Sequence, residues 1–187
     1  MTVEHAGASG EVEAVVALGA NLGDRTATLD AAVAELGGLP ETSLMVASRW
    51  HDSVALTPEG LDPEKPPYLN GVAVLRSRLA PHALLHELRR LELAHGRDRS
   101  AAAPRWGDRT LDLDLIVHGD ARLETPELTL PHPRAHERDF VLRPWLEVRP
   151  DAVLPGQGAV AQLLARLATG SESTVEPATA PETGGRP

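Results

Sequence analysis

Two aspartates, Asp112 and Asp114, lie in the run Thr110–Gly119 (TLDLDLIVHG), which otherwise has the apolar composition of a β-strand. Side chains alternate between the two faces of a strand, so the intervening leucines should point into the core and the two carboxylates should share the opposite face. Their Cα atoms would then lie roughly 6.5–7 Å apart. At that spacing two charged carboxylates repel each other unless a cation lies between them.

Two kinds of cation could relieve this repulsion. A magnesium ion takes oxygen ligands and is commonly held by one or two carboxylates together with substrate phosphates. Alternatively, Arg105 and Arg109 of the same segment could pair with the aspartates on a solvated face. Spacing alone leaves both interpretations open, because a D-x-D pattern is a weak motif.

Arginines gather in the same third of the chain, although the formal net charge of the whole chain is −9. A focused cationic cluster on an acidic protein indicates a specific anion site rather than a surface for nucleic acid. Acidic metal ligands beside several arginines suit a phosphate chain, since metal ions bridge its oxygens and guanidinium groups hold the others. The cluster comprises Arg97, Arg99, Arg105, Arg109, Arg122, Arg134, Arg138 and Arg143.

Among the histidines, His132 lies in a proline-bounded turn beside Arg134 and is interpreted as a hydrogen-bond partner of phosphate. His82 and His86 are one helical turn apart, but without an HExxH motif a solvated helix face is the favoured interpretation. The sequence contains neither GxxxxGK[ST] nor GxGxxG, so a nucleotide would be bound without a P-loop.

The elements that must position these side chains follow from hydrophobic periodicity. Asp24 can cap a helix that ends near Leu36, and Pro81 can open a second helix that runs to about Gly96. The order β-α-β-β-α-β predicts an α+β fold, namely a ferredoxin-like α/β sandwich whose mainly antiparallel sheet has helices packed on one face. The predicted strands cover residues 13–19, 43–56, 68–79 and 110–119.

Beyond these elements, residues 57–67 are expected to form a proline-rich loop, residues 121–148 short strands and turns, and residues 159–168 a last helix. Residues 1–11 are expected to be a flexible lead and residues 12–169 one folded domain. The segment 170–187 is rich in Gly, Ser, Pro, Thr and Glu and is expected to be disordered.

The length and composition of the chain exclude several classes of protein. The 187 residues suffice for one domain with a core. No apolar run could span a membrane, and the first residues lack the basic and apolar regions of a signal peptide. The absence of cysteine excludes disulfides and Cys-bound zinc and fits a reducing compartment. We therefore expect a cytoplasmic protein with no nucleic-acid or membrane partner.

Five blocks occur in order along the chain: LGANLGDR, YLNGVAVL, LELAHGRDR, RWGDRTLDLDLIVHGD and LTLPHPRAHERDFVL. From about Val15 to Leu167 the chain therefore resembles the 6-hydroxymethyl-7,8-dihydropterin pyrophosphokinase family of folate biosynthesis. The resemblance implies transfer of a diphosphoryl group from ATP to 6-hydroxymethyl-7,8-dihydropterin, which gives AMP and the pterin pyrophosphate. It also implies two Mg²⁺ ions held by Asp112 and Asp114. A monomer with only small-molecule substrates is expected.

The resemblance also assigns roles to individual residues. The implied catalytic residues are Arg97, Arg99, Asp112 and Asp114, and Asp114 is also placed to help deprotonate the pterin hydroxymethyl group. The implied ATP-binding residues are Glu92, Arg97, Arg99, Arg109, Leu115, Thr129, His132 and Arg138. The implied pterin-binding residues are Ser53, Leu56, Tyr68, Asn70, Trp106, Asp112 and Phe140. Aromatic rings suit a flat heterocycle, and an amide matches its donor–acceptor edge.

The chain departs from the family pattern at several positions. Arg89 replaces a common Gln of the nucleotide pocket, Ser53 replaces a usual Thr, and Val54 and Ala55 stand where proline is frequent. Asp108 likewise replaces a frequent proline, and the loop 57–67 is a few residues longer than in compact members.

Two other classes of protein remain as alternatives. A metal-dependent phosphohydrolase using Asp112, Asp114 and His132 would release phosphate without an acceptor. A non-catalytic nucleotide-binding module would bind ATP without turnover. For the enzyme we also expect the loop 98–108, which carries Arg99 and Trp106, to close when both substrates are bound.

Overall fold

The computed structural model describes residues 10–57, 60–97 and 109–172 of the chain. The expected N-terminal lead up to residue 9 and the expected tail from residue 173 lie outside the described residues. The elements are β1 (Val12–Ala20), α1 (Arg25–Gly37), β2 (Thr42–Ala47), β3 (His51–Ser53), β4 (Ala55–Thr57), β5 (Gly60–Asp62), β6 (Tyr68–Ser77), α2 (Pro81–Ala94), β7 (Asp112–His118), β8 (Leu123–Glu124), β9 (Thr129–Leu130), the 3₁₀ helix η1 (Ala135–Glu137), α3 (Asp139–Val148), β10 (Val153–Leu154), β11 (Gly158–Ala159) and α4 (Val160–Glu172).

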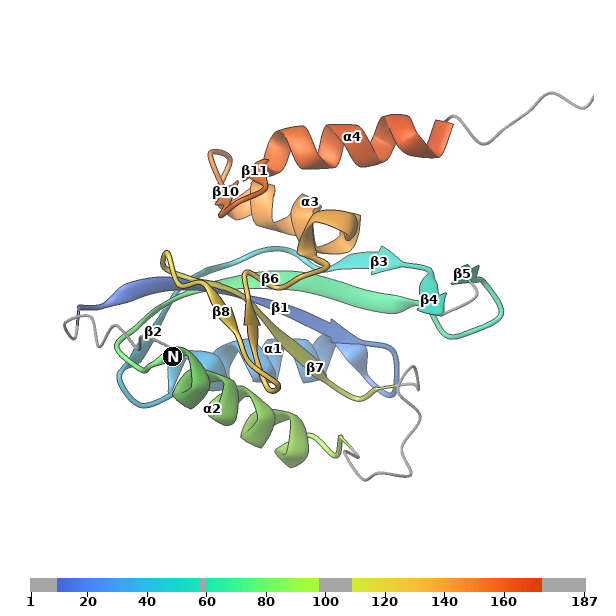
Figure 1. Cartoon of the computed structure of the whole chain (residues 1–187). Coiled ribbons are helices and arrows are strands. Elements are labelled where there is room, and N and C mark those ends of the chain that lie inside the picture. The colour runs from blue at the N-terminus through green and yellow to red at the C-terminus, as the bar shows by residue number, and fades with distance from the viewer. Residues whose placement is uncertain (1–9, 58–59, 98–108, 173–187) are drawn as a thin grey trace, which may run out of the picture.

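A five-stranded antiparallel sheet forms the centre of the molecule, with the order β2-β6-β1-β7 and with β3 also pairing β6 (Figure 1). The central strand β1 lies between β6 and β7, antiparallel to both. With α1 following β1 and α2 following β6, this topology is ferredoxin-like, so the predicted fold class is confirmed.

The predicted boundaries of the two first helices are close to those observed. The Asp24 side chain accepts a hydrogen bond from the backbone N–H of Ala27 at 3.0 Å, which satisfies one free donor at the start of α1. Pro81 opens α2 at a position where no backbone donor is needed. Apolar side chains of both helices, such as Leu29 and Leu84, are completely buried against the sheet.

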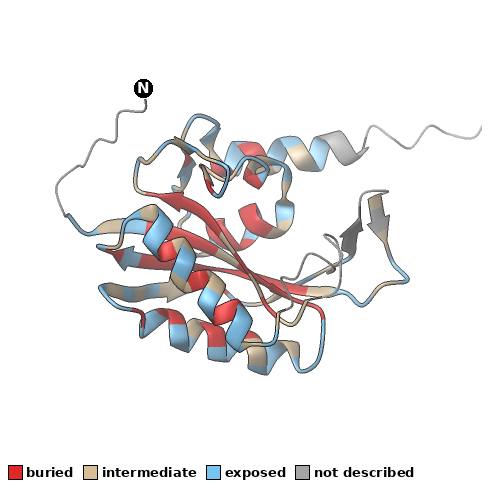
Figure 2. Ribbon diagram, turned by 60° about the horizontal axis from the view of Figure 1, so that its bottom comes forward, coloured by how far each residue is buried: buried red, intermediate tan, exposed pale blue. Residues whose placement is uncertain are grey.

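Helices cover both faces of the sheet, so the prediction that they lie on one face is wrong. Helices α1 and α2 pack on the face that carries Val16 and Leu18, whereas α3 packs on the face that carries Val15 and Ile116, and α4 packs on α3 (Figure 1). Buried residues concentrate along the central strands, between the two helical layers (Figure 2). Helix α3 lies where short strands and turns were predicted. It was not predicted because it contains Pro144, and a proline removes an internal hydrogen bond of a helix.

One strand was predicted over residues 43–56, but the structure divides this segment into the separate strands β2, β3 and β4. Strand β2 ends at Ala47, and Ser48 Oγ then accepts the Val72 N–H at 3.0 Å. The Trp50 ring lies against Gly71, where any Cβ would come within 2.6 Å of the ring, so only glycine fits there. The segment predicted as a loop, 57–67, contains part of the β4–β5 hairpin.

Candidate active site

The two aspartates lie on the face of β7 that the alternation predicts. Leu113 and Leu115, the alternating residues, are buried in the core under α1 and α2. Asp112 and Asp114 project from the other face, and their side chains remain 20% and 35% exposed. Their opposite neighbours on β1 are Gly19 and Ala17, whose small size leaves open space beside the carboxylates.

A row of residues across the sheet forms the floor of this site. Directly opposed residues of antiparallel strands point to the same face. The registers place Asp112 opposite Gly19, Gly19 opposite Asn70, and Asn70 opposite His51. A Cβ at Gly19 would approach Asn70 Oδ1 to 3.1 Å, so glycine keeps the space between Asp112 and Asn70 open.

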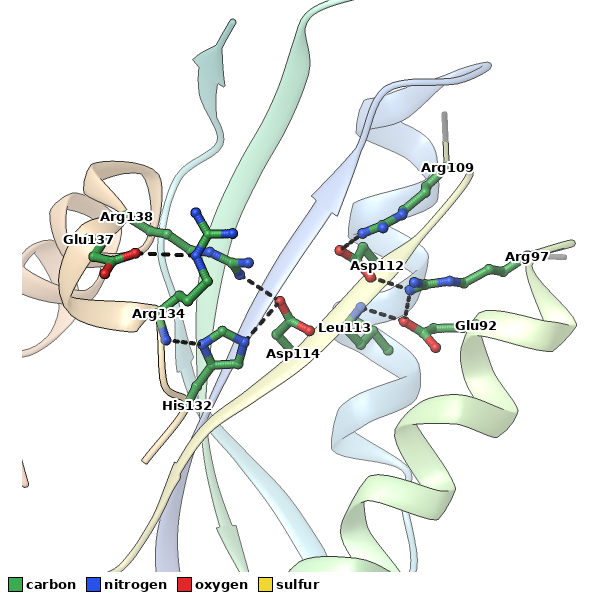
Figure 3. A network of polar contacts seen from close by, with 10 residues as sticks. All are labelled: Glu92, Arg97, Arg109, Asp112, Leu113, Asp114, His132, Arg134, Glu137 and Arg138. Carbon is green, nitrogen blue, oxygen red and sulfur yellow. Dashed lines mark hydrogen bonds and ion pairs between the residues drawn. The ribbon is translucent and has the colours of Figure 1, made fainter. Parts of the chain in front are cut away.

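Asp112 is held between two arginines (Figure 3). Arg109 Nη1 donates to Asp112 Oδ2 at 2.6 Å, and Arg97 Nη1 donates to both Asp112 Oδ1 and Glu92 Oε1. Burial alone would raise the pKa of Asp112, but the charges of Arg109 and Arg97 outweigh it and hold that pKa below its usual range. Glu92 is fully buried at the end of α2 and also accepts the Leu113 N–H at 2.8 Å.

Asp114 faces a second group of residues, which comes from the segment before α3 (Figure 3). Arg138 Nη1 donates to Asp114 Oδ2 at 2.9 Å, and His132 Nε2 lies 3.9 Å from the same oxygen. Within the described part of the chain, Asp114 Oδ1 has no polar partner. Arg138 Nε is buried and likewise has no hydrogen-bond partner among these residues.

The neutral ring of His132 can donate a hydrogen bond toward Asp114. Its Nδ1 accepts the Arg134 N–H at 3.2 Å, so the neutral ring carries its hydrogen on Nε2, the atom that faces Asp114. Burial lowers the pKa of His132, and Asp114 offsets this only in part. The ring is therefore uncharged at neutral pH.

Within the described residues, the charged side chains around the two aspartates pair with one another. Three carboxylates (Glu92, Asp112, Asp114) face three guanidinium groups (Arg97, Arg109, Arg138). Of the two predicted partners, Arg109 bonds Asp112, whereas Asp114 pairs with Arg138 instead; Arg105 lies outside the described residues.

Asp112 and Asp114 also fit a magnesium ion. Among residues 10–57, 60–97 and 109–172, no group of three or more acidic, histidine or cysteine side chains could hold a metal by itself. A site with two carboxylates must therefore take its other ligands from water or substrate oxygens, which is how magnesium is commonly bound. The exposed carboxylates and the unpartnered Asp114 Oδ1 meet this requirement.

Two pockets open on the two sides of Asp114. The first, of about 90 Å³, is walled by Ser53, Tyr68, Asn70 and Phe140 and also reaches both aspartates, Arg109 and Arg138. The second, of about 300 Å³, is lined by residues from α2, β7 and the β8–β9 region. Its lining includes Arg89, Arg97, Asp114, Leu115, Thr129 and His132.

The first pocket has both an apolar and a polar wall. Tyr68 lies opposite Ser53 on paired strands, and Asn70 Nδ2 donates to Ser53 Oγ at 2.7 Å. Phe140 belongs to the first turn of α3, and the Arg138 guanidinium lies over its ring at 5.7 Å from the centroid.

The structure brings most of the predicted site residues together around these two pockets. Arg99 and Trp106, and with them the predicted loop closure, lie outside the described residues, and Leu56 is described only by its backbone in β4. His82 and His86 are exposed on α2, which confirms the interpretation as a solvated face. Glu92 reaches the site through Arg97.

One residue that connects segments of the site was not predicted from the sequence. Asn21 is buried, accepts the Arg109 N–H at 2.7 Å and donates to the Pro66 carbonyl at 3.5 Å. It therefore joins the segment before Asp112 to the segment before Tyr68. Its position in the block LGANLGDR was the available signal.

Comparisons with known proteins agree with this geometry. A family model described as 7,8-dihydro-6-hydroxymethylpterin-pyrophosphokinase (HPPK) matches residues 15–150. A 2-amino-4-hydroxy-6-hydroxymethyldihydropteridine pyrophosphokinase of Haemophilus influenzae is 37% identical over 157 residues, which cover 84% of this chain and 94% of the relative. The enzyme of the same name from Pseudomonas aeruginosa is 41% identical over 150 residues, 80% of this chain and 88% of the relative.

A solved structure shares the fold. The crystal structure of Plasmodium falciparum HPPK-DHPS with pteroate superposes with a TM-score of 0.65 at 12% identity over 88% of this chain. This chain spans only 44% of the length of that solved chain. From the matching family model and the similarity to the bacterial enzymes, we conclude that the chain belongs to the 7,8-dihydro-6-hydroxymethylpterin-pyrophosphokinase family.

Proposed function

We propose that the two pockets hold the two substrates of this family's reaction, with Asp114 between them. The enzyme transfers a diphosphoryl group from ATP to 6-hydroxymethyl-7,8-dihydropterin in folate biosynthesis. The observation that supports the placement is that Asp114 lines both pockets. A residue shared by both pockets can act where the diphosphoryl donor and the hydroxyl acceptor meet.

The pterin occupies the first pocket in this proposal. Tyr68 and Phe140 offer aromatic surfaces to a flat ring system, while Ser53 and Asn70 offer hydrogen-bonding groups at its edge. ATP occupies the second pocket, which Leu115 and Thr129 help to line. Arg97 and His132 line this second pocket together with Asp114.

Two Mg²⁺ ions are proposed to accompany ATP, with Asp112 and Asp114 as their protein ligands. When bound, magnesium would neutralise negative charge on the phosphate oxygens. The carboxylates supply oxygen ligands on one face of β7, and the rest of each coordination shell is left to phosphates and water.

The arginines are proposed to bind the triphosphate. Arg97, Arg109 and Arg138 bond the carboxylates that are proposed to hold the metal ions. Guanidinium groups bind phosphates as readily as carboxylates, so they can turn to the triphosphate when the carboxylates take up magnesium. Neutral His132 adds an uncharged N–H donor to the same phosphates.

Asp114 has a second role in this proposal. Its Oδ1 has no polar partner within the described residues, and the residue lines both pockets, so this oxygen can accept the proton of the pterin hydroxymethyl group. The oxygen that loses this proton then attacks the β-phosphorus of ATP, and AMP leaves.

We place this reaction in the cytoplasm and in a monomer. The residues assigned to the two pockets belong to this chain. No helix in the described part of the chain is long and apolar enough to cross a membrane.

The test compares Asp112→Asn and Asp114→Asn with Asp120→Asn, a control at an exposed position just after β7. A coupled assay measures AMP release with Mg–ATP, in the presence and absence of the hydroxymethyl pterin. We expect the two site variants to lose at least about 10³-fold in kcat, roughly 4 kcal/mol of transition-state stabilisation, and the control to stay near wild type. A kcat within tenfold of wild type for either site variant would show that the metal assignment is wrong. AMP or phosphate release without pterin would instead favour the phosphohydrolase.

A further inference from the structure

Glu147, near the end of α3, binds the segment that leads into β3 through three contacts. Its Oε1 accepts from the backbone N–H of Arg49 at 3.1 Å and from Arg49 Nε at 2.9 Å. Its Oε2 lies 2.9 Å from His51 Nε2. The Arg49 side chain, then its backbone N–H and in smaller part His51, lower the pKa of Glu147 to about 2, so this carboxylate stays charged at neutral pH. We call these three residues the α3 clamp.

The clamp joins two elements that both contribute to the walls of the first pocket. Phe140 precedes Glu147 by seven residues, which places both on nearly the same face of α3 about 10.5 Å apart along its axis. His51 and Ser53 are two residues apart on β3 and therefore share one face. Phe140 and Ser53 line the pocket at one end of this helix–strand pair, and Glu147 and His51 meet at the other.

The other contacts of α3 described below do not involve β3, so they constrain the distance between α3 and β3 less than the clamp does. Val141, Leu142 and Trp145 bury apolar surface against the middle of the sheet, and such contacts have little directional preference. Arg149, just after α3, donates to Glu13 at 3.0 Å, but Glu13 lies at the start of β1, far along the sheet from Gly19 of the pocket floor. Among the described contacts, those of Glu147 are the ion pairs that connect α3 to the edge strand.

We propose that Glu147 is a positioning residue for the pterin, because its contacts with Arg49 and His51 set the distance between the Phe140 and Ser53 walls of the first pocket. This inference rests on the proposed assignment of that pocket to the pterin. Arg138, just before α3, bonds Asp114 and so holds the start of the helix to β7. Without the clamp, the edge strand can move away from α3, and a flat ring between the helix and the strand loses contact with one wall. The ATP pocket is formed by α2, β7 and the β8–β9 region and contains no part of β3. The effect should therefore fall on one substrate.

The test measures kcat and the KM values of both substrates for Glu147→Ala, Glu147→Gln and the control Glu13→Ala. The control breaks the other ion pair that links α3 and the residue after it to the sheet, with Arg149 at 3.0 Å. We expect Glu147→Ala to raise the KM for the pterin about tenfold, with the KM for ATP within twofold of wild type. Glu147→Gln should recover part of the loss, since its amide oxygen can still accept the Arg49 N–H. Glu13→Ala should leave both KM values unchanged.

Three results would overturn the inference: an unchanged pterin KM in Glu147→Ala, equal changes for both substrates, or the same pterin defect in Glu13→Ala. Phe140→Ala separates this failure from failure of the pocket assignment. If Phe140→Ala raises the pterin KM and Glu147→Ala does not, the clamp has no positioning role although the pocket is correctly assigned. If neither variant affects the pterin KM, the pocket assignment is wrong and the inference falls with it. Melting temperatures of all variants show whether each one is folded.

Discussion

Replacing Glu92 by leucine should reduce both the stability of the protein and its affinity for ATP. The Glu92 side chain is completely buried, and its Oε1 accepts from the Leu113 N–H and from the guanidinium of Arg97. Leucine has a similar size but can accept neither hydrogen bond. The variant therefore leaves a buried backbone donor unsatisfied and removes one of the two carboxylates that hold Arg97.

The magnitude follows from these contacts. Removing one member of a buried ion pair costs about 3–5 kcal/mol, of which the unsatisfied N–H of Leu113 accounts for about 1–3 kcal/mol. Arg97 keeps Asp112 as a partner and is 14% exposed, so we expect the low end, about 3 kcal/mol. At about 2–4 °C per kcal/mol for a chain of this size, the melting temperature should fall by about 6–12 °C. Glu92→Gln, which can still accept from Leu113, should lose roughly half as much.

Urea denaturation and steady-state kinetics check this expectation. The matched control is Glu87→Gln on the same helix, where Glu87 binds Arg90 at 2.9 Å on the surface and should contribute only about 0.3–0.5 kcal/mol. In Glu92→Leu the KM for ATP should also rise, because Arg97 loses the contact that orients it toward the second pocket. A loss below about 1 kcal/mol, similar to that of the control, would refute the conclusion that Glu92 is anchored by both contacts.

Three further variants or titrations test other contacts. Burial lowers the pKa of His118, so the stability that its neutral form contributes is present above about pH 6.5 and is lost as the pH falls through the lower pKa of the folded state. Urea denaturation at pH 7 and pH 5 should accordingly show a smaller loss for His118→Gln than for wild type, and equal losses would contradict this. The Glu147 carboxyl should titrate near pH 2 by NMR, whereas a value near 4.5 would show that its contacts with Arg49 and His51 do not form in solution. Asn21→Ala should lower kcat/KM for both substrates by about tenfold, since one side chain joins the Arg109 and Pro66 segments; a defect for one substrate alone would contradict that role.

Local patterns in the sequence predicted the elements that carry the site. The alternation of leucines and aspartates in β7 places Asp112 and Asp114 on one face because a strand has a period of two, whatever surrounds it. The same holds for the cap at Asp24 and for Pro81 at the start of α2. Helix α3 was missed because Pro144 contradicts its local pattern, and burial of Val141, Leu142 and Trp145 against the sheet outweighs that penalty.

The contacts within the site depend on the fold and could not be read from local patterns. Glu92 and Leu113 are 21 residues apart, and Arg49 and Glu147 are 98 residues apart, so only the topology of the sheet brings them together. Family resemblance implied which arginines would face the triphosphate. It did not indicate that Arg97, Arg109 and Arg138 bond the two aspartates.

The most direct measurement of the proposed reaction is ³¹P NMR of the products formed from Mg–ATP and 6-hydroxymethyl-7,8-dihydropterin. If Asp114 lies between the two substrates, both the β- and γ-phosphorus should appear on the pterin as a diphosphate ester, together with an equal amount of AMP. Under the same conditions Asp114→Asn should give neither product. Formation of ADP or inorganic phosphate by the wild-type enzyme, or product formation by Asp114→Asn at the wild-type rate, would contradict direct diphosphoryl transfer at this site.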